Sequence, residues 1–530
     1  MMPSEYKIAS APRTVFWLAA GLAATATIPY WNSVTGPWLL DDIPLIARNP
    51  FVQRPDWWWR LWTGDYWAST GAASGLYRPL PLTTYALTWW FAGGWTPIYH
   101  ATNMLLHAVC TVLLFLGFLR FAAAASAVAA AAVFALHPVH AEAVANIAGR
   151  TELMLGAGLL ASLHGAGVLG DGRRFAGSML TICGTACMVF SKETGLVLSV
   201  LVIGLLIRGG LGNSGANRNA AFLGAAAVGA VAAIHLAMRV AFAGTRTLLE
   251  RTPAAWDWLL LSLSAAGKNT QLLLMPWHQQ AVWPLPGPEG PPKSFVIFGV
   301  VTIVALALAL AQSGRFGPLT RLSLYVLVFA ALPLLHVVPN VIWVWERGLY
   351  LPVMALSGLV CSALGHVRSL RTRQALVYAV ALAACAGGVR AAVMSRLYAD
   401  DLRFHEYQWR VNPNDAGAAL SLSESLRRRG RTDEAAELRL RAYALAPVRG
   451  PVVMAVSGFL LEAGRTVEAA RILESAAAAD LEFHTPEQAA QGYQMLAELA
   501  DRLGLREASR AFSVRARNQR PSGASAENLP

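Results

Sequence analysis

The chain has 530 residues, of which 55% are hydrophobic and only 14% are charged, whereas soluble domains carry about 25% charged residues. Lys and Arg (43) outnumber Asp and Glu (31), giving a formal charge of +12, and this excess lies in the apolar part before residue 397. These proportions exclude a soluble enzyme and a disordered protein. Nucleic-acid binding is disfavoured, because the basic residues are dispersed between apolar runs and form no continuous stripe.

Apolar runs long enough to cross a bilayer recur along the chain up to residue 397, and a crossing helix needs about 20 apolar residues. We expect about eleven spans, at 14–31, 98–119, 121–140, 152–169, 175–190, 194–208, 219–241, 294–312, 321–337, 349–366 and 374–392. Two further apolar segments, 79–94 and 257–275, contain prolines or polar residues. We expect both to lie at the outer membrane interface.

The positive-inside rule sets the orientation. If neither ambiguous segment crosses, the arginines at one set of helix ends all face the cytoplasm: Arg120, Arg173, Arg174, Arg208, Arg218, Arg315, Arg321, Arg368, Arg371 and Arg373. The N-terminus is then cytoplasmic and the C-terminal part extracytoplasmic. The first outer loop, about 32–97, is rich in tryptophan, which prefers the headgroup level of a membrane, so this loop is expected to rest on the bilayer surface.

Two adjacent carboxylates, Asp41 and Asp42, follow the first expected span. Neighbouring carboxylates near a membrane surface repel one another and lose water, which raises at least one pKa towards that of a useful general base. An aspartate before a helix is equally typical of an N-cap. The spacing alone leaves both interpretations open.

Histidines and a carboxylate form a second cluster, His137-Pro138-Val139-His140 with Glu142. This set could coordinate a divalent cation, or its members could be structural or bind substrate at a cavity wall. The five cysteines all lie in apolar stretches and predict neither disulfides nor a zinc site.

Charged pairs interrupt two apolar regions, at Lys192-Glu193 and at Glu346-Arg347. Lysine is scarce before the tail, and the arginine side chain offers a two-pronged donor for phosphate. These residues therefore favour contact with an anion. Local pairing at helix ends is the structural alternative.

The tail contains an internal repeat, because the sequence of 430–436 recurs at 464–470 with an offset of 34 residues. This period is typical of tetratricopeptide helix–turn–helix units. A degenerate third unit surrounds Gly504. We expect a membrane-embedded domain over 1–397, a tetratricopeptide-repeat domain over 398–520 and a disordered tail over 521–530.

Several motifs occur together in a fixed order: Asp41-Asp42, Gly64-Asp65-Tyr66-Trp67, Tyr77-Arg78-Pro79-Leu80, Tyr99-His100 with Asn103 and His107, His137-Pro138-Val139-His140 with Glu142, Gly149-Arg150, Lys192-Glu193-Thr194-Gly195, and Glu346-Arg347 with Leu349-Tyr350 and Pro352. From about residue 14 to 360 this pattern resembles the transmembrane and tetratricopeptide-repeat-containing O-mannosyltransferases. One departure is Leu76, where the family has Ser before Tyr-Arg-Pro-Leu. The tail also has fewer repeats than in that family. This difference affects the expected acceptor more than the expected reaction.

The resemblance implies an all-α, polytopic C-type glycosyltransferase that inverts the anomeric centre and takes its sugar, mannose by analogy, from a polyprenyl phosphate. The catalytic base maps to Asp41 or Asp42. We expect the donor phosphate to contact Arg78, Arg150, Lys192 and Arg347, on a wall opposite the aspartates. Further substrate or cavity residues are expected at His100, Asn103, His107, His137, His140, Glu142, Glu193, Glu346 and Tyr350.

The expected partners are the lipid-linked sugar and an extracytoplasmic protein or peptide acceptor recruited by the repeats. No cofactor is firmly indicated, although a divalent metal stays open. The short loops and short tail favour a bacterial inner membrane. The alternatives are a non-catalytic membrane scaffold and a transporter of lipid-linked sugars, and the second would expose polar residues on both sides of the membrane.

Overall fold

A computed structural model describes residues 12–71, 74–208, 218–244, 255–280, 283–286, 290–336, 342–483 and 486–519. Nearly all its regular structure is helical, which confirms the predicted all-α class. The described exception is an antiparallel ribbon of β1 (Trp283–Pro284) and β2 (Ile342–Val344). The chain divides into two compact units, one ending at Ala399 and the other beginning at Asp400. The division into a transferase and a repeat domain stays a prediction.

The first unit contains fifteen described α-helices: α1 (Pro12–Thr27), α2 (Pro50–Gln53), α3 (Pro79–Ala92), α4 (Thr96–Phe118), α5 (Ala124–Ala135), α6 (His140–Ala145), α7 (Arg150–Gly170), α8 (Arg174–Ser191), α9 (Thr194–Ile207), α10 (Arg218–Phe242), α11 (Ala255–Leu274), α12 (Lys293–Ala311), α13 (Pro318–Ala331), α14 (Tyr350–His366) and α15 (Leu370–Ser395). Short 3-10 turns join them at Ile28–Ser33, Pro55–Leu61, Ala68–Thr70, Ile147–Gly149, Ser313–Arg315, Leu332–Leu335, Glu346–Leu349 and Arg396–Ala399, and a π turn lies at Ile43–Ala47.

Eight described helical segments are long and apolar enough to cross a membrane, so the protein is a multi-pass membrane protein: Thr96–Phe118, Ile147–Gly170, Arg174–Ser191, Asn219–Phe242, Lys293–Ala311, Pro318–Leu335, Glu346–His366 and Leu370–Ala399. The expected spans at 14–31, 121–140 and 194–208 correspond to α1, α5 and α9, which have 16, 12 and 14 residues. The count of eleven therefore stays a prediction. The ambiguous segments form α3 and α11, which are not among the eight.

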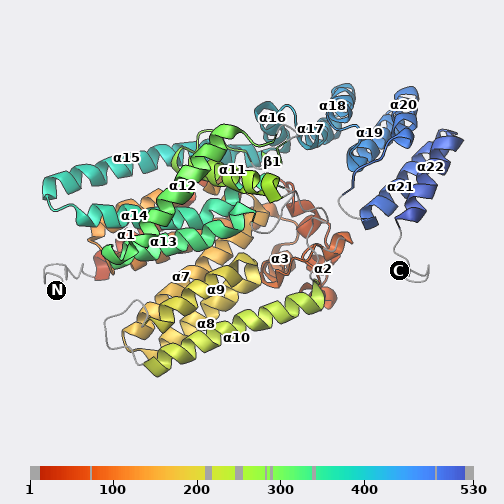
Figure 1. Ribbon diagram of the computed structural model, residues 1–530. Helices are drawn as coiled ribbons and strands as arrows, with labels where there is room; N and C mark the ends of the chain where they lie inside the picture. Colours follow the sequence, from red (N-terminus) through yellow and green to blue (C-terminus); the bar gives the residue numbers. More distant parts are fainter. Residues whose placement is uncertain are drawn as a thin grey trace. The chain divides into compact units, whose positions relative to one another are not determined.

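Charged turns lie at opposite ends of the helix bundle. The turn between α7 and α8 carries Asp171, Arg173 and Arg174, whereas the turn between α8 and α9 carries Lys192 and Glu193. These turns are separated by the 18 residues of α8, or about 27 Å. Figure 1 shows α7, α8 and α9 side by side. The arginine-rich turns thus lie far from the Lys192 turn, although which end faces the cytoplasm stays a prediction.

Glycines allow the backbones of α7 and α8 to touch. A Cβ added to Gly184 of α8 would lie 2.6 Å from the backbone nitrogen of Ser162 and 2.7 Å from the carbonyl oxygen of Gly158, both in α7. Small residues commonly permit such close contact between membrane helices. The contact also aligns the two helix ends that carry Arg150 and Ser191.

The close contact at Gly184 predicts a large effect on stability. Gly184→Leu must push α7 and α8 apart, and we expect it to lower the free energy of unfolding by about 1–3 kcal/mol or more. Thermal denaturation of the purified protein in detergent measures this loss. The matched control is Gly204→Leu in α9, where an added Cβ meets nothing within 4 Å. Equal losses in the two variants would contradict the packing argument.

The described part of the second unit contains seven helices: α16 (Asp401–Val411), α17 (Ala416–Arg428), α18 (Thr432–Leu445), α19 (Gly450–Glu462), α20 (Thr466–Ala478), α21 (Pro486–Arg502) and α22 (Arg506–Asn518). The pairs α17–α18, α19–α20 and α21–α22 pack as hairpins. Gly430, Gly464 and Gly504 occupy the turns with φ of 76°, 77° and 71°, a backbone region that favours glycine. Their assignment to tetratricopeptide repeats stays a prediction, and the expected disordered tail lies outside the described residues.

Candidate active site

A sharp turn at Leu40 precedes the two adjacent aspartates. Leu40 has a φ of +46°, a left-handed conformation that is rare for a branched side chain. Asp42 is 1% exposed, and its carboxylate accepts hydrogen bonds from the backbone nitrogens of Ala148, at 2.7 Å, and Leu39, at 3.2 Å. The carboxylate of Asp42 therefore ties this turn to the start of α7, while Asp41 stays partly exposed.

Arg347 joins Asp41 to Glu142. Its Nη1 and Nη2 atoms donate to Oδ2 of Asp41 at 3.3 and 3.2 Å. Its backbone nitrogen donates to Oε2 of Glu142 at 2.8 Å, and its Nε lies 3.5 Å from Oε1 of the same carboxylate. The Asp41 side chain is 33% exposed and that of Arg347 is 21% exposed. One guanidinium therefore connects the first loop, α6 and the turn before α14.

Two further cations have carboxylate partners nearby. Lys192 pairs with Glu152, and Arg78 pairs with Glu193 through contacts of 2.9 Å from Nε and 2.8 Å from Nη2. Burial lowers the pKa of Lys192, the positive charges of Arg78 and Arg347 act in the same direction, and Glu152 opposes them. Arg78 and Arg347 are thus both close enough to Lys192 to affect its charge.

The exposed fractions show which of these charges a ligand can reach. The side chains of Arg78, Glu193 and Lys192 are 15%, 17% and 17% exposed, whereas that of Glu152 is 2% exposed. The guanidinium of Arg78 also lies 5.1 Å from the ring centre of Tyr66. Neither Tyr66 nor Glu152 was expected as a site residue. Tyr66 belongs to the motif Gly64-Asp65-Tyr66-Trp67, and Glu152 follows the motif Gly149-Arg150, and these positions are the only signals in the sequence that could have indicated them.

The structure differs from the expected two-wall arrangement. Arg347 contacts Asp41 directly, so these groups do not face one another across an empty space. Arg150 is 0% exposed; it donates to Asn103 Oδ1 at 2.9 Å, the Thr84 hydroxyl at 3.2 Å and the Tyr99 carbonyl at 3.1 Å. Because its donors are used within the packed interior, we leave Arg150 out of the proposed donor site.

Asn103 extends the interior network around Arg150. Its side-chain amide donates to the carbonyl oxygens of Asn146 at 3.0 Å and Ile147 at 3.2 Å. Since Asn103 also accepts from Arg150, it fixes the turn before α7. These contacts indicate that Asn103 and Arg150 position the backbone that binds Asp42.

Imidazole and phenol rings pack together beneath the charged cluster. Nδ1 of His107 lies 2.9 Å from the Tyr350 hydroxyl, and its Nε2 lies 3.1 Å from the Ala135 carbonyl. The His140 ring centre is 4.6 Å from that of Tyr350 and 5.2 Å from that of His107. His107, His140 and Tyr350, which were all expected at the cavity, are thus completely buried.

The remaining expected residues face other partners. His137 is buried, with Nε2 3.1 Å from the Leu273 carbonyl, and His100 is buried on α4. Glu346 accepts from the Gln280 backbone at 2.5 Å and from the Trp283 indole at 3.1 Å. Glu346 therefore binds Gln280 and β1 next to Arg347, and the sequence around Gln280 does not predict this role.

His137, His140 and Glu142 do not come together as a coordination set. Glu142 binds Arg347, whereas His137 contacts a carbonyl and His140 packs among rings. Within the described ranges, no group of three or more His, Cys, Asp and Glu side chains could hold a metal ion. A chelator added to the transfer assay tests whether the protein requires a divalent metal.

Burial of two carboxyl groups predicts a pH-dependent stability. Burial raises the pKa of Asp42 from 3.8 to about 7, against the effect of hydrogen bonds from Leu39 and Ala148. Burial likewise raises the pKa of Glu142 to about 7, against the charge of Arg347. A pKa raised by folding contributes stability below the ordinary pKa, and this contribution is lost as pH rises through the folded value.

We therefore expect the melting temperature to fall between about pH 4 and pH 7. Asp42→Asn should weaken this dependence by on the order of 2 kcal/mol, because an amide cannot ionise. Calorimetry or fluorescence melting in detergent at several pH values measures how the stability depends on pH. The control is Asp56→Asn, which changes a carboxylate of the same loop with a 58% exposed side chain. An unchanged pH slope in Asp42→Asn would contradict the assignment.

Comparisons with known proteins find partial relatives. No protein-family model matches the chain. It is 34% identical over 149 residues to Protein O-mannosyl-transferase F38B6.6 of Caenorhabditis elegans, covering 27% of this chain and 22% of that protein. It is 30% identical over 268 residues to Protein O-mannosyl-transferase Tmtc2 of Drosophila melanogaster, covering 47% and 29%. It is 35% identical over 144 residues to human Protein O-mannosyl-transferase TMTC1, covering 26% and 16%.

The chain spans less than a third of the length of each of these relatives. All three are named as protein O-mannosyl-transferases, the enzyme class expected from the motifs. All three come from animals, so they give no support to the expected bacterial origin.

Proposed function

We propose that this protein is a membrane-embedded inverting glycosyltransferase. It transfers a sugar, with mannose as the first candidate, from a polyprenyl phosphate to a hydroxyl group of an extracytoplasmic protein. The observation that carries this proposal is the partly exposed Asp41 carboxylate beside Arg347, with Lys192 and Arg78 nearby, at one end of a membrane helix bundle. The names of the partial relatives support the reaction class.

Asp41 is the better candidate for the base. Its carboxylate is reachable from solvent, whereas that of Asp42 is buried and occupied by two backbone nitrogens. A general base must come within hydrogen-bond reach of the proton that it removes. Asp42 would then act as a positioning residue that holds Asp41 at the surface.

The proposed reaction breaks one bond to the sugar and forms another. The acceptor hydroxyl gives its proton to the Asp41 carboxylate while its oxygen forms a bond to the anomeric carbon. The bond between that carbon and the phosphate oxygen breaks, and its electron pair leaves with the phosphate. Attack on the face opposite the leaving group inverts the anomeric centre, as in inverting glycosidases.

Stabilisation of the departing phosphate falls to the cations. Arg347, Lys192 and Arg78 each have partial exposure and can neutralise the growing negative charge without a strong general acid. A phosphate would compete with the carboxylates that now pair with them. The lipid tail of the donor explains why such a site belongs at the end of membrane helices.

Direct transfer assays test the proposed function. Membranes containing the full chain are incubated with radiolabelled polyprenyl-phosphate mannose or glucose and with Ser- and Thr-containing peptides, with and without chelator. We expect label on the peptide hydroxyls. Label that crosses the membrane but stays on the lipid would identify a transporter and overturn the proposal, as would no transfer by folded protein from either donor to peptide or membrane protein.

A further inference from the structure

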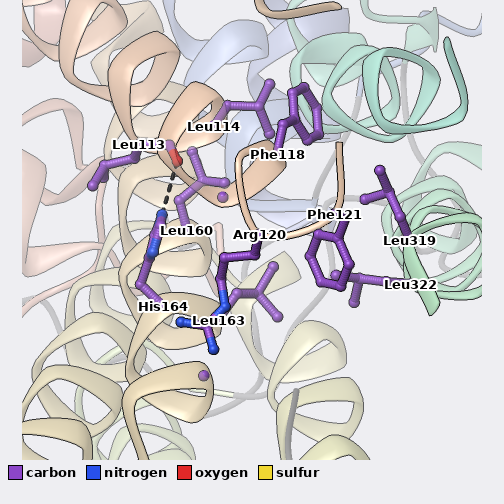
Figure 2. A pocket seen from close by; sticks show the side chains of 12 residues that line it. Leu113, Leu114, Phe118, Arg120, Phe121, Leu160, Leu163, His164, Leu319 and Leu322 are labelled. Carbon is purple, nitrogen blue, oxygen red and sulfur yellow. Dashed lines mark hydrogen bonds between the residues drawn. The ribbon is translucent and has the colours of Figure 1, made fainter. Parts of the chain in front are cut away.

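An apolar hollow lies between α4, α7 and α13. Its cavity volume is about 70 Å³, and it opens to the outside of the helix bundle. Figure 2 shows leucine and phenylalanine side chains around it, with Arg120 and His164 among them. The lining is chiefly aliphatic and aromatic: Leu114, Leu160, Leu163, Leu322, Phe118 and Phe121.

The hollow is remote from the candidate active site. It involves the C-terminal parts of α4 and α7, whereas Asn103 and Arg150 lie towards the N-terminal parts of the same helices. α4 has 23 residues, so its two ends are about 35 Å apart. The hollow therefore lies at the arginine-rich end of the bundle, near the opposite surface of the membrane.

The polar groups at the hollow differ in their availability. Nε2 of His164 is 2.8 Å from the Leu113 carbonyl, so this imidazole is already bound. Arg120 is partly exposed, and its Nη2 lies 2.9 Å from both carboxylate oxygens of Asp171. A guanidinium carries five donors, so Arg120 keeps donors for a further anion.

The charge around the mouth is positive. Arg173 and Arg174 are exposed and follow Asp171 in the turn after α7. The described residues around the mouth therefore include three arginines and one carboxylate, which leaves an excess of positive charge. Basic residues at the end of membrane helices attract anionic lipids, at about 1 kcal/mol for each charge.

We propose that this hollow binds an acyl chain of an anionic membrane phospholipid, with the lipid phosphate on Arg120. The apolar lining matches part of a hydrocarbon chain, and Arg120 lies directly after the end of α4, where a lipid headgroup would lie. A Cβ on Gly167 would lie only 3.2 Å from Cζ of Arg120, so the glycine lets the arginine lie flat against α7. The site goes beyond the proposed transferase function and does not depend on it.

Lipid binding to the purified full chain tests this proposal. The protein in detergent is titrated with phosphatidylglycerol or phosphatidylcholine of equal chain length, and retained lipid is counted by native mass spectrometry. We expect phosphatidylglycerol to be retained at least tenfold more tightly. Arg120→Gln should remove most of this preference, whereas Arg371→Gln, which removes an exposed arginine at the start of α15, should not.

Substitutions that fill the hollow with larger side chains test whether the acyl chain binds there. Leu163→Trp should weaken retention of phosphatidylglycerol at least tenfold, with Leu322→Phe as a second variant if the first fails to fold. Leu236→Trp adds the same bulk at a 49% exposed position of α10 and should have no effect. Equal retention of the two lipids, equal effects of Arg120→Gln and Arg371→Gln, or unaltered retention in the filled variants would overturn the proposal. Displacement by inorganic phosphate, or retention of polyprenyl phosphate alone, would overturn it too.

Discussion

Asp41→Asn should reduce sugar transfer by about 100- to 10,000-fold, the contribution typical of a general base. The amide cannot accept the proton of the acceptor hydroxyl, although it keeps the shape of the carboxylate. The fold should survive, because Asp41 is partly exposed and exposed ion pairs contribute only about 0–1 kcal/mol. Initial rates with saturating donor, together with a melting curve, measure both effects.

Asp42→Asn is the matched control for Asp41→Asn. Its amide oxygen can still accept the hydrogen bond from Ala148, so the turn at Leu40 should hold and transfer should stay within about tenfold of the original rate. If Asp42→Asn abolished transfer and Asp41→Asn did not, the two roles would be reversed. Full activity in both variants would remove the assigned base.

Arg347→Gln should impair both stability and transfer. Glu142 would be left buried without its cation, and breaking a buried ion pair costs about 3–5 kcal/mol. Transfer should also fall, because the departing phosphate would lose a two-pronged donor. Melting curves and the dependence of rate on donor concentration measure the two losses.

A double variant separates the two roles of Arg347. In Arg347→Gln/Glu142→Gln the buried carboxylate is absent, so we expect much of the stability to return while transfer stays low. Arg347→Lys keeps the charge but loses the planar fork, and it should raise KM for the donor more than it lowers kcat. Recovery of normal transfer in the double variant would mean that Arg347 serves only the fold.

The helical class and the charged clusters could be predicted from the sequence because they depend on local patterns. Apolar runs of sufficient length identify membrane helices, and short hydrophilic interruptions identify their ends. The separation of Lys192 and Glu193 from Arg173 and Arg174 follows directly from the length of α8. The helices α1, α5 and α9 lie at three of the expected spans but are shorter than those spans, so whether they cross the membrane stays a prediction.

The pairing of the charges could not be predicted from the sequence. Arg347 meets Asp41 across 306 residues, a contact set by tertiary packing alone. Arg150 carries the same side chain as Arg347, yet Asn103 and the Tyr99 carbonyl bind it in the interior. The turn at Leu40 determines which of the two adjacent aspartates has a buried carboxylate. Two identical neighbouring residues in the sequence do not predict this difference.

The bridge made by Arg347 has a thermodynamic consequence. Because one guanidinium serves Asp41 and Glu142 together, the three groups form a coupled unit whose members share one interaction energy. The changes in the free energy of unfolding caused by substitutions within such a unit are not additive. Losses caused by replacing Asp41 and Glu142 singly should therefore exceed, when added, the loss caused by replacing both at once.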